Sequence, residues 1–175
     1  MINDALIFIA KEMNDYFRDV VGISEDCVIV SAITNRDGTI TANTENKIVI
    51  TVANIEADII KNNIGIHNRS LPGSESVENL NIYIVTAASY TNYNESLQSI
   101  FNAITFLKQN AIFISSETND LNKAIDKIII EMVNLSIENV DHLWSALKAS
   151  YMPSAVYKIR IFYNNPIAVE QIPAQ

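Results

Sequence analysis

The chain has 175 residues, of which 49% are hydrophobic and 18% are charged, and its formal net charge is −8. This length fits one domain, and the acidic balance argues against a nucleic-acid partner, because an acidic surface repels phosphates. A single cysteine excludes an internal disulfide and a zinc cluster built from cysteines.

The high apolar content favours self-association, because such a chain can keep apolar surface after its core is filled. No uninterrupted apolar run reaches the roughly 18 residues of a membrane span. The first ten residues lack the basic start and the small-residue cleavage site of a signal peptide. We therefore expect synthesis and folding in the cytoplasm, with no insertion into a membrane.

Three elements are predicted in the first third of the chain. Apolar residues at three- and four-residue spacing predict a helix over residues 4–20. The β-branched run 27–34 predicts a short strand, and the pair Asp37-Gly38 that follows is typical of a tight turn. Residues 47–57 form the clearest strand. Its first half is apolar on both faces, which predicts a central place in a covered sheet.

The middle of the chain begins with a long irregular stretch. Residues 60–77 are rich in Asn, Ser, Gly and Pro, and loops of this length are often functional. A strand is predicted over residues 79–90. Asn92 and Glu95 then resemble a capping box that opens a second helix. Its apolar residues are predicted to share one stripe: Leu97, Ile100, Phe101, Ile104 and Leu107.

The last third is predicted to hold three strands and one helix. Short and long apolar runs predict strands over residues 111–114 and 126–135. Ser136 is predicted to cap a third helix that runs to about residue 149. The final strand, residues 155–163, alternates between two faces. One face carries Tyr157, Ile159, Ile161 and Tyr163, and the other carries Lys158, Arg160 and Phe162.

The predicted order α-β-β-β-α-β-β-α-β is typical of a single α+β domain. We expect this domain to span residues 1–163, as a mostly antiparallel β-sheet flanked by about three helices. Residues 164–175 are predicted to form an extended C-terminal tail. Short apolar residues recur in it at Ile167, Val169 and Ile172, which suits a strand that joins the sheet edge of a neighbour. Terminal disorder is the alternative.

The sequence shows no recognisable catalytic or cofactor site. His67 lies in the polar loop and His142 on the third predicted helix, and two histidines without further ligands make no zinc signature. The four glycines form neither a dinucleotide fingerprint nor a P-loop. The acidic residues are scattered. We predict that the protein is not an enzyme and needs no cofactor. A small-molecule enzyme is the remote alternative.

Several stretches resemble a known protein family. Three of them are residues 1–6, 47–56 and 80–85. The most specific stretch is 139–160, in which a Leu-Trp-Ser-Ala-Leu helix precedes Tyr-x-Pro-Ser and a strand with Tyr-x-Ile-Arg. From residue 1 to about residue 162, the chain resembles the cap, or tube-terminator, proteins of phage-tail-like extracellular contractile injection systems.

This resemblance implies a fold like that of phage tail terminators, and no catalytic residues. It implies a homo-oligomeric ring, a hexamer, that ends the inner tube and the sheath and stabilises the extended sheath. The implied partners are other copies of the chain, sheath protein and tube protein, in a particle that is later released or anchored. The alternative is another tail component, such as a tail-completion or neck subunit.

Three groups of residues are candidate interface positions. Lys158 and Arg160 are expected to register the ring against sheath or tube, and a passive, solvated pair is the alternative. The loop over 60–77, with His67 and Arg69, is a candidate for the segment that faces the lumen or the tube. The tail, with Ile167, Val169 and Ile172, is a candidate for strand addition to a neighbour.

Overall fold

The computed structural model describes residues 2–57, 80–118 and 120–163. The predicted loop with His67 and Arg69, and the predicted tail with Ile167, Val169 and Ile172, lie outside the described residues. The element order confirms the predicted one. The elements are α1 (Ile2–Tyr16) with a π-helical turn (Phe17–Val21), β1 (Val28–Val30), β2 (Lys47–Ala57), β3 (Leu80–Ser89), α2 (Tyr93–Gln109), β4 (Ile112–Ile114), β5 (Ile125–Val133), α3 (Ile137–Ala146) and β6 (Ser154–Tyr163).

The strands form one six-stranded sheet in the order β1-β2-β3-β6-β5-β4. β1 pairs with β2 in parallel, and the other four pairings are antiparallel. This arrangement confirms the predicted α+β fold with a mostly antiparallel sheet. β3 and β6 lie side by side in the middle, although more than sixty residues separate them in the sequence.

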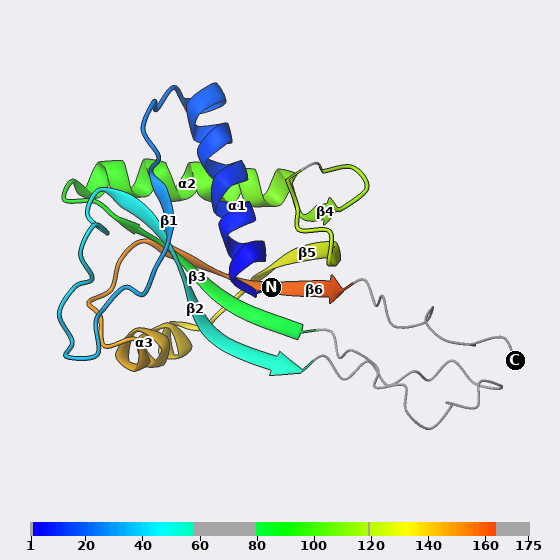
Figure 1. The fold of residues 1–175 in the computed structure, drawn as a ribbon. Coiled ribbons are helices and arrows are strands. Elements are labelled where there is room, and N and C mark those ends of the chain that lie inside the picture. Colours follow the sequence, from blue (N-terminus) through cyan, green and yellow to red (C-terminus); the bar gives the residue numbers. More distant parts are fainter. Residues whose placement is uncertain (1, 58–79, 119, 164–175) are drawn as a thin grey trace, which may run out of the picture.

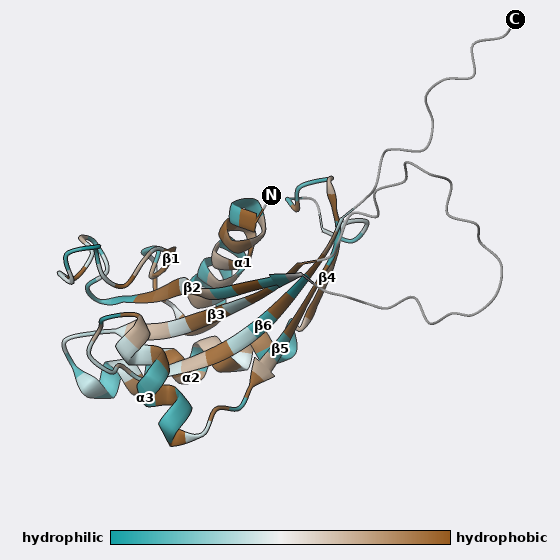
Figure 2. Cartoon of the chain, turned by 90° about the horizontal axis from the view of Figure 1, so that it is seen from below, coloured by the Kyte–Doolittle hydropathy of each residue, from teal (hydrophilic) through white to brown (hydrophobic). Residues whose placement is uncertain are grey.

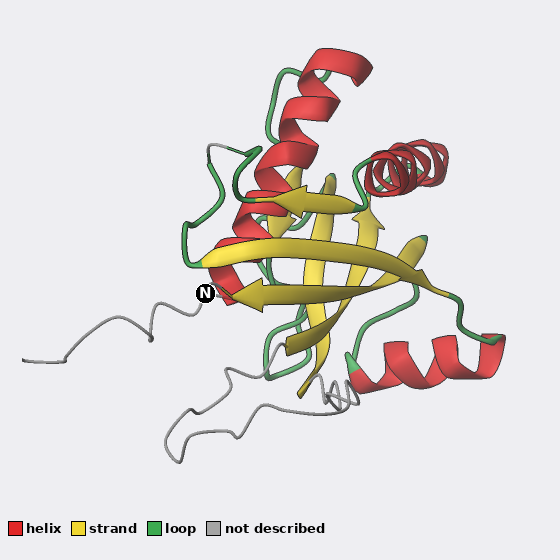
Figure 3. Ribbon diagram, turned by 90° about the vertical axis from the view of Figure 1, so that its right-hand side faces the viewer, coloured by secondary structure: helices red, strands yellow, loops and turns green. Residues whose placement is uncertain are grey.

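Helices α1 and α2 cover one face of the sheet, and α3 lies against one end of the opposite face (Figures 1 and 3). The main core therefore lies between the sheet and the first two helices, where Phe8, Ile9 and Met13 of α1 are buried. A smaller core lies under α3, where Trp144 packs near Val49, Val85 and Ala87.

The two cores explain why the first half of β2 is apolar on both sides. Ile48 and Ile50 belong to the main core, whereas Val49 between them belongs to the core under α3. Since successive side chains of a strand point to opposite faces, this segment needs apolar residues at every position. The predicted covered position of residues 47–57 is confirmed for this half. From Ala53 to Glu56 the side chains are exposed.

Both predicted helix N-caps are present. The side chain of Asn92 accepts a hydrogen bond from the amide of Asn94, and its amide group donates one to Glu95 (3.3 Å). The hydroxyl of Ser136 accepts one from the amide of Asn139. The two bonds from the amides of Asn94 and Asn139 satisfy donors that an uncapped first turn leaves free.

Some local predictions were wrong. The stripe predicted on α2 does not face the core as a unit, because Leu97 is exposed and Phe101 is 67% exposed. The helix instead packs through Ile100, Phe106 and Leu107 with small residues between them, and these are Ser96, Ser99 and Ala103. Small side chains on that face allow the helix to approach the sheet closely. The third helix ends at Ala146, earlier than predicted, and the chain then turns through Lys148 with a φ of 53°.

Candidate functional site

The face of the sheet that carries α3 includes hydrophilic segments where α3 does not reach (Figure 2). No helix of the described residues covers this part. We call it the open face. Strand register and alternation place these residues on it: Asn54, Glu56, Asn81, Tyr83, Lys127, Ile129, Glu131, Lys158, Arg160 and Phe162.

One row of the open face crosses four strands. Asn54 of β2 pairs with Tyr83 of β3, Tyr83 pairs with Lys158 of β6, and Lys158 pairs with Glu131 of β5. Directly paired side chains on one face lie about 4.5–5.5 Å apart at Cβ, so these residues form a continuous polar ladder. Lys158 is half-buried, and its cross-strand neighbours are the phenol of Tyr83 on one side and the carboxylate of Glu131 on the other.

Arg160 and Glu131 form the ion pair of this face. Nη2 of Arg160 donates a hydrogen bond of 2.8 Å to Oε1 of Glu131. Glu131 also lies opposite Lys158 in the strand register, so this carboxylate is the cross-strand neighbour of a second cation. The cations Lys127, Lys158 and Arg160 outnumber the carboxylates Glu56 and Glu131 here, although the whole chain carries a net charge of −8.

The third cation is held by an aromatic ring. Nζ of Lys127 lies 4.7 Å from the ring centroid of Phe162, its cross-strand partner. Such cation–π contacts contribute about 0.5–1 kcal/mol at exposed sites. The contact keeps the ammonium group on the open face at the end of β6.

Two polar atoms at the centre of the open face are buried without a hydrogen-bond partner among the described residues. They are Oδ1 of Asn81 and Nε of Arg160, on residues that pair directly across β3 and β6. Asn81 is only 5% exposed. A buried polar group without a partner costs about 1–3 kcal/mol. Because both atoms are buried, they lower the stability of this part of the sheet and are not themselves exposed to a partner.

Tyr83 links the ladder to β2. Its burial, and then the nearby carboxylate of Glu56, raise the pKa of its phenol above the ordinary value. Both causes oppose a negative charge on the phenol. Tyr83 is therefore a neutral hydrogen-bonding group of the open face at physiological pH.

The predicted interface pair Lys158 and Arg160 is brought together with Lys127 on this open face. Their contact with a partner stays a prediction, as do the roles of the candidates outside the described residues. His142 is exposed on α3. Within residues 2–57, 80–118 and 120–163, no three His, Cys, Asp or Glu side chains gather as metal ligands, and no helix has the length and apolarity to cross a membrane.

A second surface was not predicted from the sequence. A cleft of about 530 Å³ lies along α3, and we call it the aromatic cleft. Trp144 is buried in it and meets Tyr151 edge-on, with ring centroids 5.7 Å apart. Tyr151 is 64% exposed and Ile137, at the start of α3, is 90% exposed. Ile137 precedes Trp144 by seven residues and so lies on the same side of α3, which means that helical periodicity alone could not have identified this cleft.

Comparisons with known proteins agree with each other on the fold. The family model described as "Pvc16 N-terminal domain" matches residues 7–172. A solved structure of the sheath/tube terminator, in the extended state, of the extracellular contractile injection system PVC is similar, with a TM-score of 0.56 and 11% sequence identity. The match covers 100% of this chain and 61% of that chain. A search of curated proteins found no match. The resemblance and the fold expected from the sequence are confirmed.

Proposed function

This chain belongs to the Pvc16 N-terminal domain family, and we propose that it is a structural subunit whose ring ends the tube and sheath of a contractile particle. The observation that carries this proposal is the fold match to a sheath/tube terminator along the whole chain. The family match over residues 7–172 supports it independently. Other copies of the chain, sheath protein and tube protein are the proposed partners.

Several features of the molecule support a role in assembly over a role in catalysis. The described residues present an open face of charged side chains and an aromatic cleft with exposed Ile137 and Tyr151. These surfaces differ in chemistry and position. A terminating subunit has to contact its ring neighbours and also the sheath or the tube, so it needs several distinct contact surfaces. We take a hexamer as the ring size and a non-enzymatic role as part of the proposal.

We assign the open face to the contact with sheath or tube. Its three cations suit an acidic counterpart, whereas most of the remaining surface of this acidic chain would repel one. Assembly would take place in the cytoplasm before the particle is released or anchored.

Charge reversal tests this assignment directly. The double variant Lys158→Glu and Arg160→Glu should reduce the fraction of particles that carry the chain at least tenfold, as counted by electron microscopy with a tagged chain. The matched control reverses two exposed charges outside the open face, Arg36→Glu with Lys108→Glu, and should leave that fraction unchanged. Equal occupancy for both variants would remove the open face from the contact.

The same images test the wider proposal. The tag should appear at one end of the tube and sheath. A tag at a neck or a head connection would favour a tail-completion or neck subunit, which is the alternative function.

A further inference from the structure

The outer edge of the sheet is paired over only part of its length. β1 pairs with β2 at three positions, Val28–Val30 with Ile48–Ile50. β2 continues to Ala57, and no described strand pairs with its outer side beyond Ile50. Main-chain groups on such an edge can accept a strand from another chain.

A groove runs beside this open edge. It has a volume of about 510 Å³ and lies where β1 stops, between the start of α1 and β2. Ile2 and Leu6 of α1 form one wall, and Val30, Ile50 and Val52 form the other. A strand that continued the line of β1 would occupy this groove and place alternate side chains against the apolar wall of α1.

The hydrogen-bond pattern shows which main-chain groups face the groove. The amide of Ile48 donates to the carbonyl of Cys27 (2.7 Å), and the carbonyl of Ile50 accepts from the amide of Ser31 (3.1 Å). Val52 is the next residue in this alternation, so its main-chain amide and carbonyl also point to the outer side of β2. A β-bulge between Val52 and Asn54 changes this alternation by one residue. The next residue whose main-chain groups point outward is therefore Ile55, which pairs with Ile82 and is 48% exposed.

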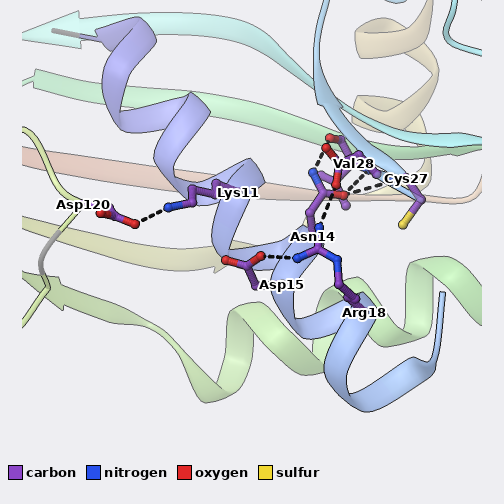
Figure 4. A network of polar contacts seen from close by, with 8 residues as sticks. Lys11, Asn14, Asp15, Arg18, Cys27, Val28 and Asp120 are labelled. Carbon is purple, nitrogen blue, oxygen red and sulfur yellow. Dashed lines mark hydrogen bonds and ion pairs between the residues drawn. The ribbon is translucent and has the colours of Figure 1, made fainter. Parts of the chain in front are cut away.

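The other end of this edge is closed by a side chain (Figure 4). Nδ2 of Asn14 donates to the carbonyl of Val28 (2.9 Å), and Oδ1 accepts from the amides of Cys27 (2.9 Å) and Val28 (2.8 Å). Asn14 thus satisfies the outward groups of β1 as a neighbouring strand would. Capping of this kind protects an edge from pairing, which confines strand addition to the part of β2 after Ile50.

We propose that residues 167–172 of a second copy add as a strand to the outer edge of β2 between Thr51 and Ala57. This inference rests on the proposed ring. Ile167 and Val169 are spaced to face the apolar wall of α1, and Pro166 and Pro173, which cannot donate to a ladder, bracket the segment. Strand addition gives the ring its main-chain contact between subunits.

The topology favours a second copy as the donor. Ile161 of β6, Leu80 and Ala57 lie in one cross-strand row, so the donor tail and the acceptor edge both belong to this end of the sheet, two strands apart. That separation is about 10 Å, and the tail of the same copy would have to cross it and then reverse direction. A donor and an acceptor at different places on each subunit produce a head-to-tail contact that can close into a ring.

Cysteine cross-linking tests the contact in the full chain. Differently tagged chains, one with Ile55→Cys and one with Ile167→Cys, Val169→Cys or Gln171→Cys, are mixed during assembly and oxidised. We expect a disulfide-linked heterodimer for at least one tail position. Phe101→Cys on the outside of α2 is the control acceptor and should give at least tenfold less. If no disulfide-linked heterodimer forms at any of the three tail positions, or if the Phe101→Cys control acceptor gives as much, the inference is overturned.

A second variant pair separates this contact from the ring itself. Ile55→Pro removes an outward amide, whereas Ile55→Thr keeps it, and circular dichroism confirms that both fold. We expect Ile55→Pro to lower the ring fraction at least tenfold in native mass spectrometry and Ile55→Thr to leave it unchanged. Rings that form equally well with Ile55→Pro would overturn strand addition and leave the proposed function standing. A wild-type chain that forms no ring and does not end particles would remove the proposed function as well.

Discussion

The guanidinium of Arg160 donates a hydrogen bond of 2.8 Å to the carboxylate of Glu131 across β6 and β5. Both side chains are partly exposed, and ion pairs of this kind contribute about 0.2–1 kcal/mol. We predict that the exchange variant, Glu131→Arg with Arg160→Glu, unfolds in urea within about 1 kcal/mol of wild type. The same exchange moves the positive charge to another strand and should still weaken docking to the particle. Full docking by the exchange variant would contradict a role for the position of Arg160.

Asn14 should be essential for the fold around β1. It makes three hydrogen bonds to the main chain of Cys27 and Val28. Asn14→Ala leaves those partly buried groups without partners and should lower the free energy of unfolding by about 2–3 kcal/mol, as measured in urea. Asn14→Asp keeps both bonds that Oδ1 accepts, so its free energy of unfolding should lie between those of wild type and Asn14→Ala. Equal stability of Asn14→Ala and wild type would show that water replaces the side chain.

Trp144 and Tyr151 touch each other but should respond differently to truncation. Trp144 is buried against Val49, Val85 and Ala87, so Trp144→Ala should destabilise the protein by about 3–5 kcal/mol. Tyr151 is mostly exposed, so Tyr151→Ala should cost less than about 1 kcal/mol. Urea unfolding of the two variants checks the contrast. Similar losses for both would mean that the aromatic cleft is a single packed unit.

Alkaline pH should reveal the burial of Tyr157. Burial raises the pKa of its phenol from 10.0 to about 12, and the hydroxyl has no partner among the described residues. The unfolded chain ionises first, so this contribution to stability is complete below pH 10 and is lost progressively between pH 10 and about pH 12. A difference of two pKa units corresponds to a loss of about 2–3 kcal/mol at most.

Tyr157→Phe is the matched control for this titration. It removes the ionising hydroxyl and keeps the ring in the core. The fall in unfolding free energy from pH 9.5 to 11.5 should be smaller for this variant than for wild type. Identical slopes would show that other tyrosines, such as Tyr90 and Tyr163 with their raised pKa values, account for the whole effect.

Local signals in the sequence were sufficient for most elements. Residues 47–57 were predicted as a strand with its observed bounds, because apolar and β-branched residues continue through it without a break. Asn92 and Ser136 were correct helix caps, because a short polar side chain before an apolar run satisfies the first free amides. These signals depend on neighbours within a few residues.

Features that depend on distant partners could not be predicted. The order β3-β6-β5 and the capping of β1 by Asn14 arise from contacts between separate parts of the chain. The predicted stripe of α2 was correct for Ile100, Ile104 and Leu107 and wrong for Leu97 and Phe101. The small residues Ser99 and Ala103, which pack closely on the sheet, carry no hydrophobic signal. The same limit applies to the open face. The sequence identified Lys158 and Arg160, but the register with Glu131 and Asn81 requires the sheet.

The most direct test is the length of particles assembled with and without this chain. Tube and sheath proteins of the same particle are expressed together with the chain, without it, or with the charge-reversed Lys158→Glu and Arg160→Glu variant, and lengths are measured by electron microscopy. A terminating ring predicts uniform, extended particles with the chain, and variable lengths or contracted sheaths in the other two cases. Particles of uniform length and stably extended sheath in the absence of the chain would contradict the account.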